Sequence, residues 1–406
     1  MSPHPRRTLL TGALAALALL GSLRAPAEAT FVRSVMDRVD AEPLFNEGYF
    51  INLRSFAWPR AWDDAWSAST GGYRVNAASL DCCALYLDQG LVFARRLTPA
   101  LEFRFRYTDL EDKDRQETHH WLELEQDLGR GFSAELFGET AFRKEDADIG
   151  LGLRWRREGW QVRVRRNAVD FNFNERGSTT RSYSRKPWTD EFLVEAPLGA
   201  ATARLACEVD HPMRLEAPDE NRVFSYRRTR LWAGLGAPQG ARAEYSYEFQ
   251  TKSDIFPTPA AGRSEQSRRQ VHGLTASTRL RPSDDDELEP GLGLLVRAAR
   301  ADRPDEPQGG AFYRRWEVQP WLRWRRDITR RMTTELAPLL SLGENRVRHP
   351  GGAAPEEYHV ALETKLGAGL DFSFGPSSRI GLYATFKADT PSHPWGGGNV
   401  RAMFLF

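Results

Sequence analysis

The sequence has no long apolar run after its first 29 residues. It contains 406 residues, of which 27% are charged, and its mean hydropathy is −0.55. A transmembrane helix needs about 20 consecutive apolar residues and is therefore not expected. The net charge of +1 argues against a nucleic-acid binder, which carries a basic excess. A polar average does not exclude a membrane β-barrel, because its strands alternate polar and apolar residues.

Cysteine is also scarce, and catalytic patterns are weak. Cys82, Cys83 and Cys207 match no metal or redox spacing, and the chain has no Cys-x-x-Cys-His haem motif. Ser392 and His393 place a serine hydroxyl beside a histidine, in a segment rich in Pro and Gly that offers little to position a nucleophile. We therefore predict no enzyme activity, no catalytic residue, no metal and no cofactor.

The N-terminus has the three parts of a secretory signal peptide. Arg6 and Arg7 precede an apolar run over residues 9–20, and residues 27–29 read Ala-Glu-Ala. We expect a signal peptide over residues 1–29, a periplasmic segment over 30–48 and one barrel domain over 49–406. The mature protein is then expected to work outside the cytoplasm.

Side chains alternate with a period of two through the rest of the chain. The stretches LEFRFRYTDL (101–110), DIGLGLRWRR (148–157), ARAEYSYEFQ (241–250) and EYHVALETKLGAGLDFSF (357–374) each carry one apolar and one polar face. Many apolar faces contain Tyr, Trp and Phe, as in the interfacial girdles of membrane barrels. The alternative is a soluble β-sandwich, whose core would be richer in Leu, Ile and Val.

The connections between these stretches alternate in length. Short ones fall at 98–100, 129–131, 158–159, 197–200, 238–240 and 375–378. Long ones fall at about 111–117, 143–148, 174–187, 214–222, 256–267, 302–311, 347–356 and 389–398. Short turns at one rim and long loops at the other are typical of outer-membrane barrels. We predict an all-β fold, a single transmembrane antiparallel β-barrel of about 18 strands, beginning with residues 49–57.

The C-terminal segment NVRAMFLF places Val400, Ala402, Phe404 and Phe406 on one face. With the signal peptide and the alternating strands, it resembles Gram-negative outer-membrane β-barrel proteins, of the large porin or polysaccharide-exporter type. The resemblance implies that Phe404 and Phe406 act as the signal read by the barrel-assembly machinery. It also implies outer-membrane lipid as a partner, with an anionic polysaccharide and a periplasmic export partner as further candidates.

Arginine dominates the polar faces, which should line the lumen because a charge on the lipid face is costly near the midplane. The predicted path comprises Arg104, Arg106, Arg154, Arg156, Arg163, Arg165, Arg228, Arg230, Arg323 and Arg325. Two sectors, from Arg154 to Arg165 and from Arg279 to Arg325, are expected to have few acidic residues to neutralise them. Two interpretations stay open: a positive field that favours anions, or cross-strand ion pairs with glutamates that only hold the sheet.

Tryptophans recur with helical spacing in WPRAWDDAW, at Trp58, Trp62 and Trp66. We expect a short helix inside a long connection over residues 58–83. It either lies at the membrane interface or folds into the lumen as a constriction.

The sequence favours an outer-membrane channel for anionic solutes or polymers, most specifically for exopolysaccharide export. A general diffusion porin and a structural sleeve around a periplasmic or redox partner are the alternatives. Open, plugged and partner-filled lumens are equally compatible with the pattern.

Overall fold

The computed structural model describes residues 58–80, 84–111, 116–139, 147–170, 182–218, 221–237, 240–258, 264–302, 310–348 and 357–406. The predicted signal peptide, the segment 30–48 and the predicted strand 49–57 lie outside the described residues, as do Cys82 and Cys83. Within the described ranges, no helix combines the length and the apolar character needed to cross a bilayer.

Nearly all of the described chain is antiparallel sheet. The strands are β1 (Gly71–Leu80), β2 (Ala84–Thr98), β3 (Leu101–Glu111), β4 (Gln116–Gly129), β5 (Phe132–Glu139), β6 (Ile149–Arg157), β7 (Trp160–Ala168), β8 (Ser182–Arg185), β9 (Trp188–Leu198), β10 (Ala201–Ala217), β11 (Arg222–Gly236), β12 (Arg242–Ile255), β13 (Glu265–Ser277), β14 (Asp286–Asp302), β15 (Gly310–Thr329), β16 (Met332–Arg348), β17 (Glu357–Ser373), β18 (Ser378–Lys387) and β19 (Trp395–Leu405). The helix is α4 (Arg60–Ala68).

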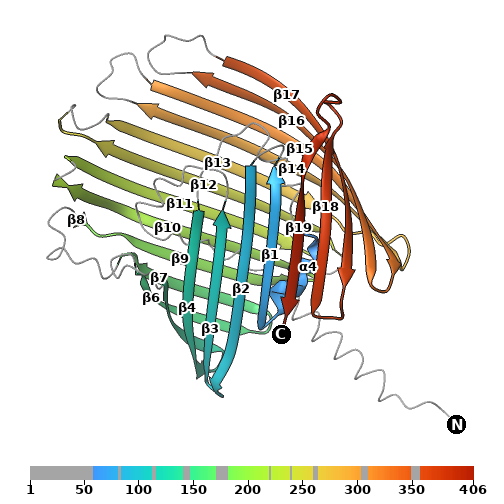
Figure 1. Ribbon diagram of the computed structural model, residues 1–406. Coiled ribbons are helices and arrows are strands. Elements are labelled where there is room, and N and C mark those ends of the chain that lie inside the picture. The colour runs from blue at the N-terminus through green and yellow to red at the C-terminus, as the bar shows by residue number, and fades with distance from the viewer. Residues whose placement is uncertain are drawn as a thin grey trace.

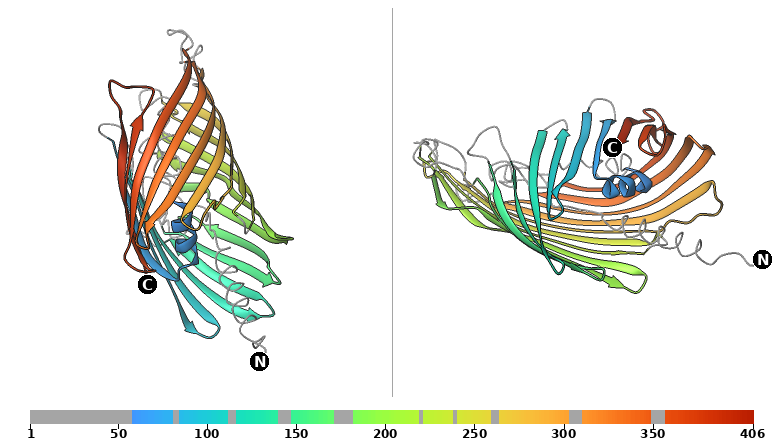
Figure 2. Two further views of the ribbon diagram at one scale, coloured as in Figure 1. Left: turned by 90° about the vertical axis from the view of Figure 1, so that its right-hand side faces the viewer. Right: turned by 90° about the horizontal axis from the view of Figure 1, so that it is seen from below.

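The sheet closes into a barrel. Strand β1 pairs with β2 on one side and with β19 on the other, from Gly72 opposite Leu405 to Leu80 opposite Gly397. Strands β8 and β9 both pair with β10 and are successive parts of one wall strand, interrupted near Pro187. The nineteen segments therefore make 18 barrel strands, as predicted. Seen from below, the barrel has a flattened outline (Figures 1 and 2).

The predicted connection over residues 58–83 is wrong for its second part, residues 71–80. Residues 71–80 form β1, and the 18 strands close without residues 49–57. The sequence GGYRVNAASL hid this strand, because glycines and alanines replace the large alternating side chains that mark the other strands. Small residues suit the position, since an added Cβ at Gly72 would lie 3.1 Å from the Trp66 ring.

The two rims differ as predicted, and we name them the short-turn rim and the long-loop rim. At the short-turn rim, β6 and β7 turn on Glu158 and Gly159, whose φ angles of 52° and 85° suit a type I′ hairpin. The acidic segment 282–290 also lies there, where Leu280 pairs with Leu288. At the other rim the predicted loop 214–222 is wrong, because β10 and β11 extend to leave a connection over residues 218–221.

The wall has an apolar outer face and a polar inner face. At the C-terminus, Val400 of β19 and the following Phe406 are 50% and 72% exposed, whereas Arg401 of β19 is 1% exposed. This confirms the predicted faces of the C-terminal strand. An exposed apolar belt around a closed antiparallel barrel is the surface that a lipid bilayer covers. The protein is an outer-membrane type β-barrel.

Candidate functional site: the barrel lumen

The ten predicted arginines all lie on the inner face of their strands. Their cross-strand partners share that face: Arg104 lies opposite Glu123, Arg230 opposite Glu208 and Arg325 opposite Glu335. Their contacts separate them into groups that differ in how fully acidic residues neutralise them.

The most enclosed group is a six-residue network that joins β3 to β7: Arg104, Arg154, Arg165, Glu123, Glu125 and Glu135. Arg154 contacts Glu125 at 2.6 Å and Glu135 at 2.5 Å. Arg165 contacts Glu123 at 2.6 Å and Glu135 at 2.5 Å, and Arg104 contacts Glu123 at 2.8 Å. The side chains of Glu123 and Glu135 are 0% exposed, so water competes little for these bonds.

The network depends on a missing side chain. An added Cβ at Gly152 would lie 2.9 Å from Glu135 Oε2 and 2.8 Å from Arg165 Cγ. Glycine at this inner position of β6 therefore gives Arg165 of β7 the room to reach across to β5.

Two smaller networks occupy other parts of the wall. Arg228 contacts Asp210 at 2.8 Å and Glu208 at 2.9 Å, and Arg230 contacts Glu248 at 2.9 Å. In the third network, Glu335 and Asp371 hold the arginines of β15 and β19. The contacts are Arg323–Glu335 at 3.1 Å, Arg325–Asp371 at 2.8 Å, Arg401–Glu335 at 3.0 Å and Arg401–Asp371 at 3.0 Å.

The prediction that two arginine sectors lack acidic partners is therefore wrong. Arg154 and Arg165 belong to β6 and β7, but they contact glutamates of β4 and β5. In the second sector Arg279 contacts Glu287 at 3.3 Å. A pairing rule based on one strand at a time misses acids that converge from two or three strands away.

Three glutamates of the six-residue network, Glu123, Glu125 and Glu135, place carboxylate oxygens within 4.8 Å of one another. Three carboxylates this close together would suit a metal cation if no arginine contacted them. Here each carboxylate accepts from guanidinium groups, so the donor set is already neutralised and does not favour a metal.

A cavity of about 500 Å³, which we name the mouth cavity, opens near the short-turn rim. Two acidic residues, Glu102 and Glu195, line it, and two of its arginines, Arg104 and Arg154, are already neutralised in the six-residue network. Its arginines are Arg95, Arg96, Arg104, Arg106, Arg154, Arg156, Arg163 and Arg204. Among them, Arg163 lies 3.8 Å from Glu191 and Arg204 lies 3.4 Å from Glu195. The excess of arginine predicted for whole sectors is concentrated in this cavity.

The helix α4 lies inside the barrel, within its outline in Figure 2. Of the two placements considered for the tryptophan segment, it takes the inner one, because Trp62 is 1% exposed and its ring lies 5.3 Å from the Arg401 guanidinium. Trp58 donates from Nε1 to Asp88 at 3.0 Å. Trp66 lines the mouth cavity.

Charged groups add to the docking of α4. Asp63 lies 3.3 Å from Arg74, whose guanidinium also lies 5.0 Å from the Trp66 ring. Asp64 lies 3.4 Å from Arg279. The surrounding barrel wall limits hydration of the Asp63 carboxyl and raises its pKa to about 6, and the attraction of Arg74 offsets only part of that rise.

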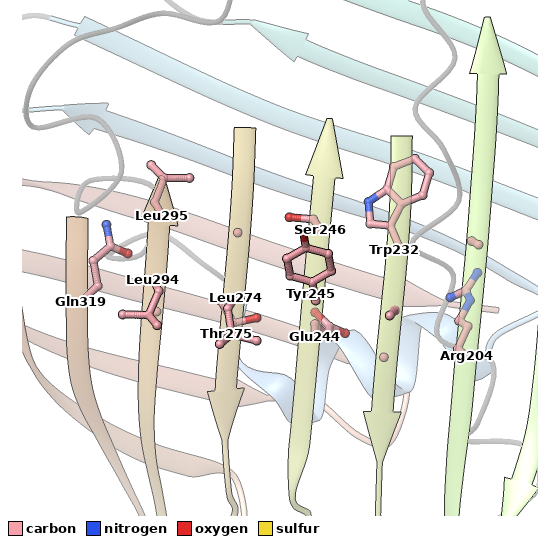
Figure 3. Close-up of a pocket in the computed structure, with 15 residues that line it drawn as sticks. Arg204, Trp232, Glu244, Tyr245, Ser246, Leu274, Thr275, Leu294, Leu295 and Gln319 are labelled. Carbon is pink, nitrogen blue, oxygen red and sulfur yellow. The ribbon is translucent and has the colours of Figure 1, made fainter. Parts of the chain in front are cut away.

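A second cavity of about 370 Å³ lies against β10–β15, where inner-face glycines leave room (Figure 3). Gly273 is one of them, since an added Cβ there would lie 2.6 Å from Ser246 Oγ. Trp232, Glu244 and Gln319 from three strands line it. We did not predict this cavity from the sequence, although Trp232 on a polar face was a usable signal.

The remaining predicted positions are at the rims. His393 contacts Ser392 at 3.2 Å, both exposed in the connection before β19. Phe404 lies opposite Tyr73, and the N–H of Phe406 donates to the carbonyl of Gly71 at 3.0 Å. Their role as an assembly signal stays a prediction.

Comparisons with known proteins give distant structural likenesses only. No family model matches the chain, and no curated protein matches it. Among solved structures, it is similar to a bacterial polysaccharide outer membrane secretin, with 10% identity, TM-score 0.40, and 83% of this chain and 99% of that chain covered. It is also similar to a loop-deletion mutant of OmpT from Vibrio cholerae, with 11% identity, TM-score 0.36, and 83% and 97% covered. A mutant porin of Rh. blastica matches with 10% identity, TM-score 0.33, and 83% and 98% covered. Likeness at this level carries no information on what the barrel transports.

Proposed function

We propose that the protein is a non-catalytic outer-membrane channel for anionic solutes or polymers, most specifically for exported polysaccharide. The mouth cavity supports this best, because six of the arginines that line it lie outside the six-residue network and only two glutamates share that lining. A guanidinium binds carboxylate or phosphate in a two-pronged geometry and is weakly hydrated, so it gives up water readily. Transport along such groups needs weak binding at several sites rather than one tight site.

The ion-pair networks refine this proposal. They neutralise most of the arginines deeper in the wall, so the positive potential should be strongest at the short-turn mouth. An anionic polymer entering from the periplasmic side would meet this mouth first. The ring of Trp66 beside the arginines would also suit a sugar ring.

Helix α4 fits a constriction in the same region. It occupies part of the lumen close to the mouth cavity, held by aromatic and charged contacts with the wall. We propose that it narrows the path and limits the conductance of the resting channel.

Planar-bilayer recording of the folded protein under a salt gradient tests the proposed function. We expect an anion-selective current that polyuronate blocks. The variants Arg156→Glu and Arg163→Glu should reduce the anion-to-cation permeability ratio by roughly threefold or more, because they reverse charges at the mouth. Arg157→Glu, an exposed outer-face change next to Arg156, is the control and should leave selectivity unchanged.

Cation selectivity in the wild type would overturn the anionic cargo. Steady current with no polyuronate block would favour the general diffusion porin. If neither the wild type nor the Trp62→Ala variant, in which α4 is displaced, conducted any current, the structural sleeve would be favoured.

A further inference from the structure

One group of exposed arginines lies on the outer face of the wall. They belong to β11 and β13–β16 and are close to the long-loop rim: Arg227, Arg268, Arg300, Arg314 and Arg346. We name them the outer arginine patch. Each shares the face of apolar neighbours, as Arg268 does with Leu274 and Arg300 with Val296. The expectation that arginines belong inside is wrong for these five.

The sheet register brings these arginines together. Arg268 lies directly opposite Arg300, and Arg314 lies directly opposite Arg346. Arg227 is separated from Arg268 only by Thr251 of the strand between them. Adjacent strands are about 5 Å apart, and like charges directly opposite each other are unfavourable. An anion bound between them would remove that repulsion.

The patch has little internal acid. Arg300 contacts Asp302 at 2.9 Å. Among the described residues, no carboxylate contacts Arg227, Arg268 or Arg314. The guanidinium groups of Arg227 and Arg268, from the two strands that flank β12, lie 5.8 and 6.0 Å from the centre of the Phe249 ring.

A depression of about 600 Å³ lies among these side chains. Arg227, Arg268 and Arg300 line it, and the short side chains of Ser225 and Ser253 keep it open. Its size and its three guanidinium groups suit a phosphate carried on a sugar or another compact headgroup.

Between the outer arginine patch and the short-turn rim, the outer face carries first aromatic and then aliphatic side chains, the order found at a membrane interface. Aromatic rings lie on the side away from the long loops: the ring centres of Tyr247 and His272 are 4.9 Å apart, and Trp316 Nε1 donates a hydrogen bond to Glu344 at 2.8 Å. Beyond them lie exposed aliphatic side chains such as Leu294 and Leu342. Aromatic girdles mark the headgroup level of a barrel, so the patch lies at or just above it.

We propose that the outer arginine patch binds the phosphate groups of a phosphorylated glycolipid in the leaflet on the long-loop side. The guanidinium groups would bind the phosphates, and the acyl chains would lie along the aliphatic face below. This inference concerns the lipid face and does not depend on what passes through the lumen.

Native mass spectrometry of the folded, full-length mature protein with bisphosphorylated lipid A tests the proposal. We expect wild type to bind this lipid, and Arg227→Gln/Arg268→Gln to bind it roughly tenfold more weakly. The matched control, Arg157→Gln/Arg326→Gln, removes two exposed outer-face arginines at the short-turn rim and should bind as wild type does. Heat-modifiable gel mobility verifies that each variant is folded.

Two further ligands separate the sources of the anion. Fully dephosphorylated lipid A should bind the wild type no better than it binds the patch variant. Inorganic phosphate alone should not occupy the patch and should leave lipid A binding unchanged. Equal lipid A binding by all variants would overturn the proposal, as would equal binding of the dephosphorylated lipid. A loss of dimer or trimer without a loss of lipid would assign the patch to a second copy of the chain instead.

Discussion

Two regions of the lumen are built around arginine, yet they differ in how the arginines are held. In the six-residue network, three arginines and three glutamates contact one another mostly at 2.5–2.9 Å, and their side chains are largely buried. Around α4, the contacts are longer and more varied. Asp63 and Asp64 lie 3.3 and 3.4 Å from their arginines, and both carboxylates are at least 40% exposed.

The difference separates a fixed part of the wall from a docked segment. Removing one partner from a buried ion-pair network leaves uncompensated charge, which is costly. Removing one exposed pair costs little, because water replaces the lost partner. The network should therefore set stability, whereas the contacts of α4 should set how often the lumen is narrowed.

The largest effect should come from Glu123→Gln. Arg104 and Arg165 would each lose a charged partner in a buried region, and we expect a loss of about 3–5 kcal/mol in the free energy of unfolding. Urea unfolding in detergent, followed by gel mobility, measures it. Glu158→Gln, which removes an exposed pair with Arg157, is the control and should unfold as wild type does. Equal midpoints for the two variants would show that the network does not stabilise the barrel.

Trp62→Ala should have the next largest effect, on conductance rather than stability. It removes the ring that is buried against Arg401, so α4 should leave the lumen more often. We expect the mean single-channel conductance to rise by roughly twofold or more, because a constriction limits current. Trp160→Ala removes an exposed outer-face ring near the same rim and should leave conductance unchanged. An unchanged conductance in Trp62→Ala would contradict the constriction.

The smallest effect should be a pH dependence from Asp63. Its pKa rises from 3.8 to about 6 in the docked helix, so between these values docked Asp63 holds a proton that it would release when undocked. Docking is then favoured at low pH and weakens as the pH rises through 6. We expect lower conductance at about pH 5 than at about pH 7.5. Asp63→Asn should conduct equally at both, and a wild type with the opposite slope would reject the assignment.

Alternation and loop length were enough to predict the fold. The strand over 101–110 was found to within one residue, because Phe103, Phe105 and Tyr107 alternate with charged residues. Strand β1 was missed, because its inner face carries Gly72 and Ala78 and therefore gives little contrast. The predicted strand number was still correct, because an even number was assumed and residues 49–57 were counted as a strand in place of β1.

The site was harder to predict than the fold. Alternation placed all ten arginines on the inner face, but partners such as Glu335 and Arg401 are 66 residues apart in the chain. Which acid reaches which arginine depends on the stagger and curvature of the closed barrel, and neither is encoded in a single strand. The spacing of the tryptophans was enough to predict that α4 is helical. Its place in the lumen depends on arginines from β1, β15 and β19, which that spacing does not reveal.

The pairing of β1 with β19 has a consequence for how the barrel is made. Most neighbouring strands are hairpins, whose ends meet after a short stretch of chain. The β1–β19 seam joins residues such as Asn76 and Asn399, which share a hydrogen bond across 323 positions. The entropy cost of closing so long a loop delays such a contact, so the seam should form last. Until then both edge strands expose unpaired backbone groups, and a folding catalyst that holds these two edges would govern the final step of assembly.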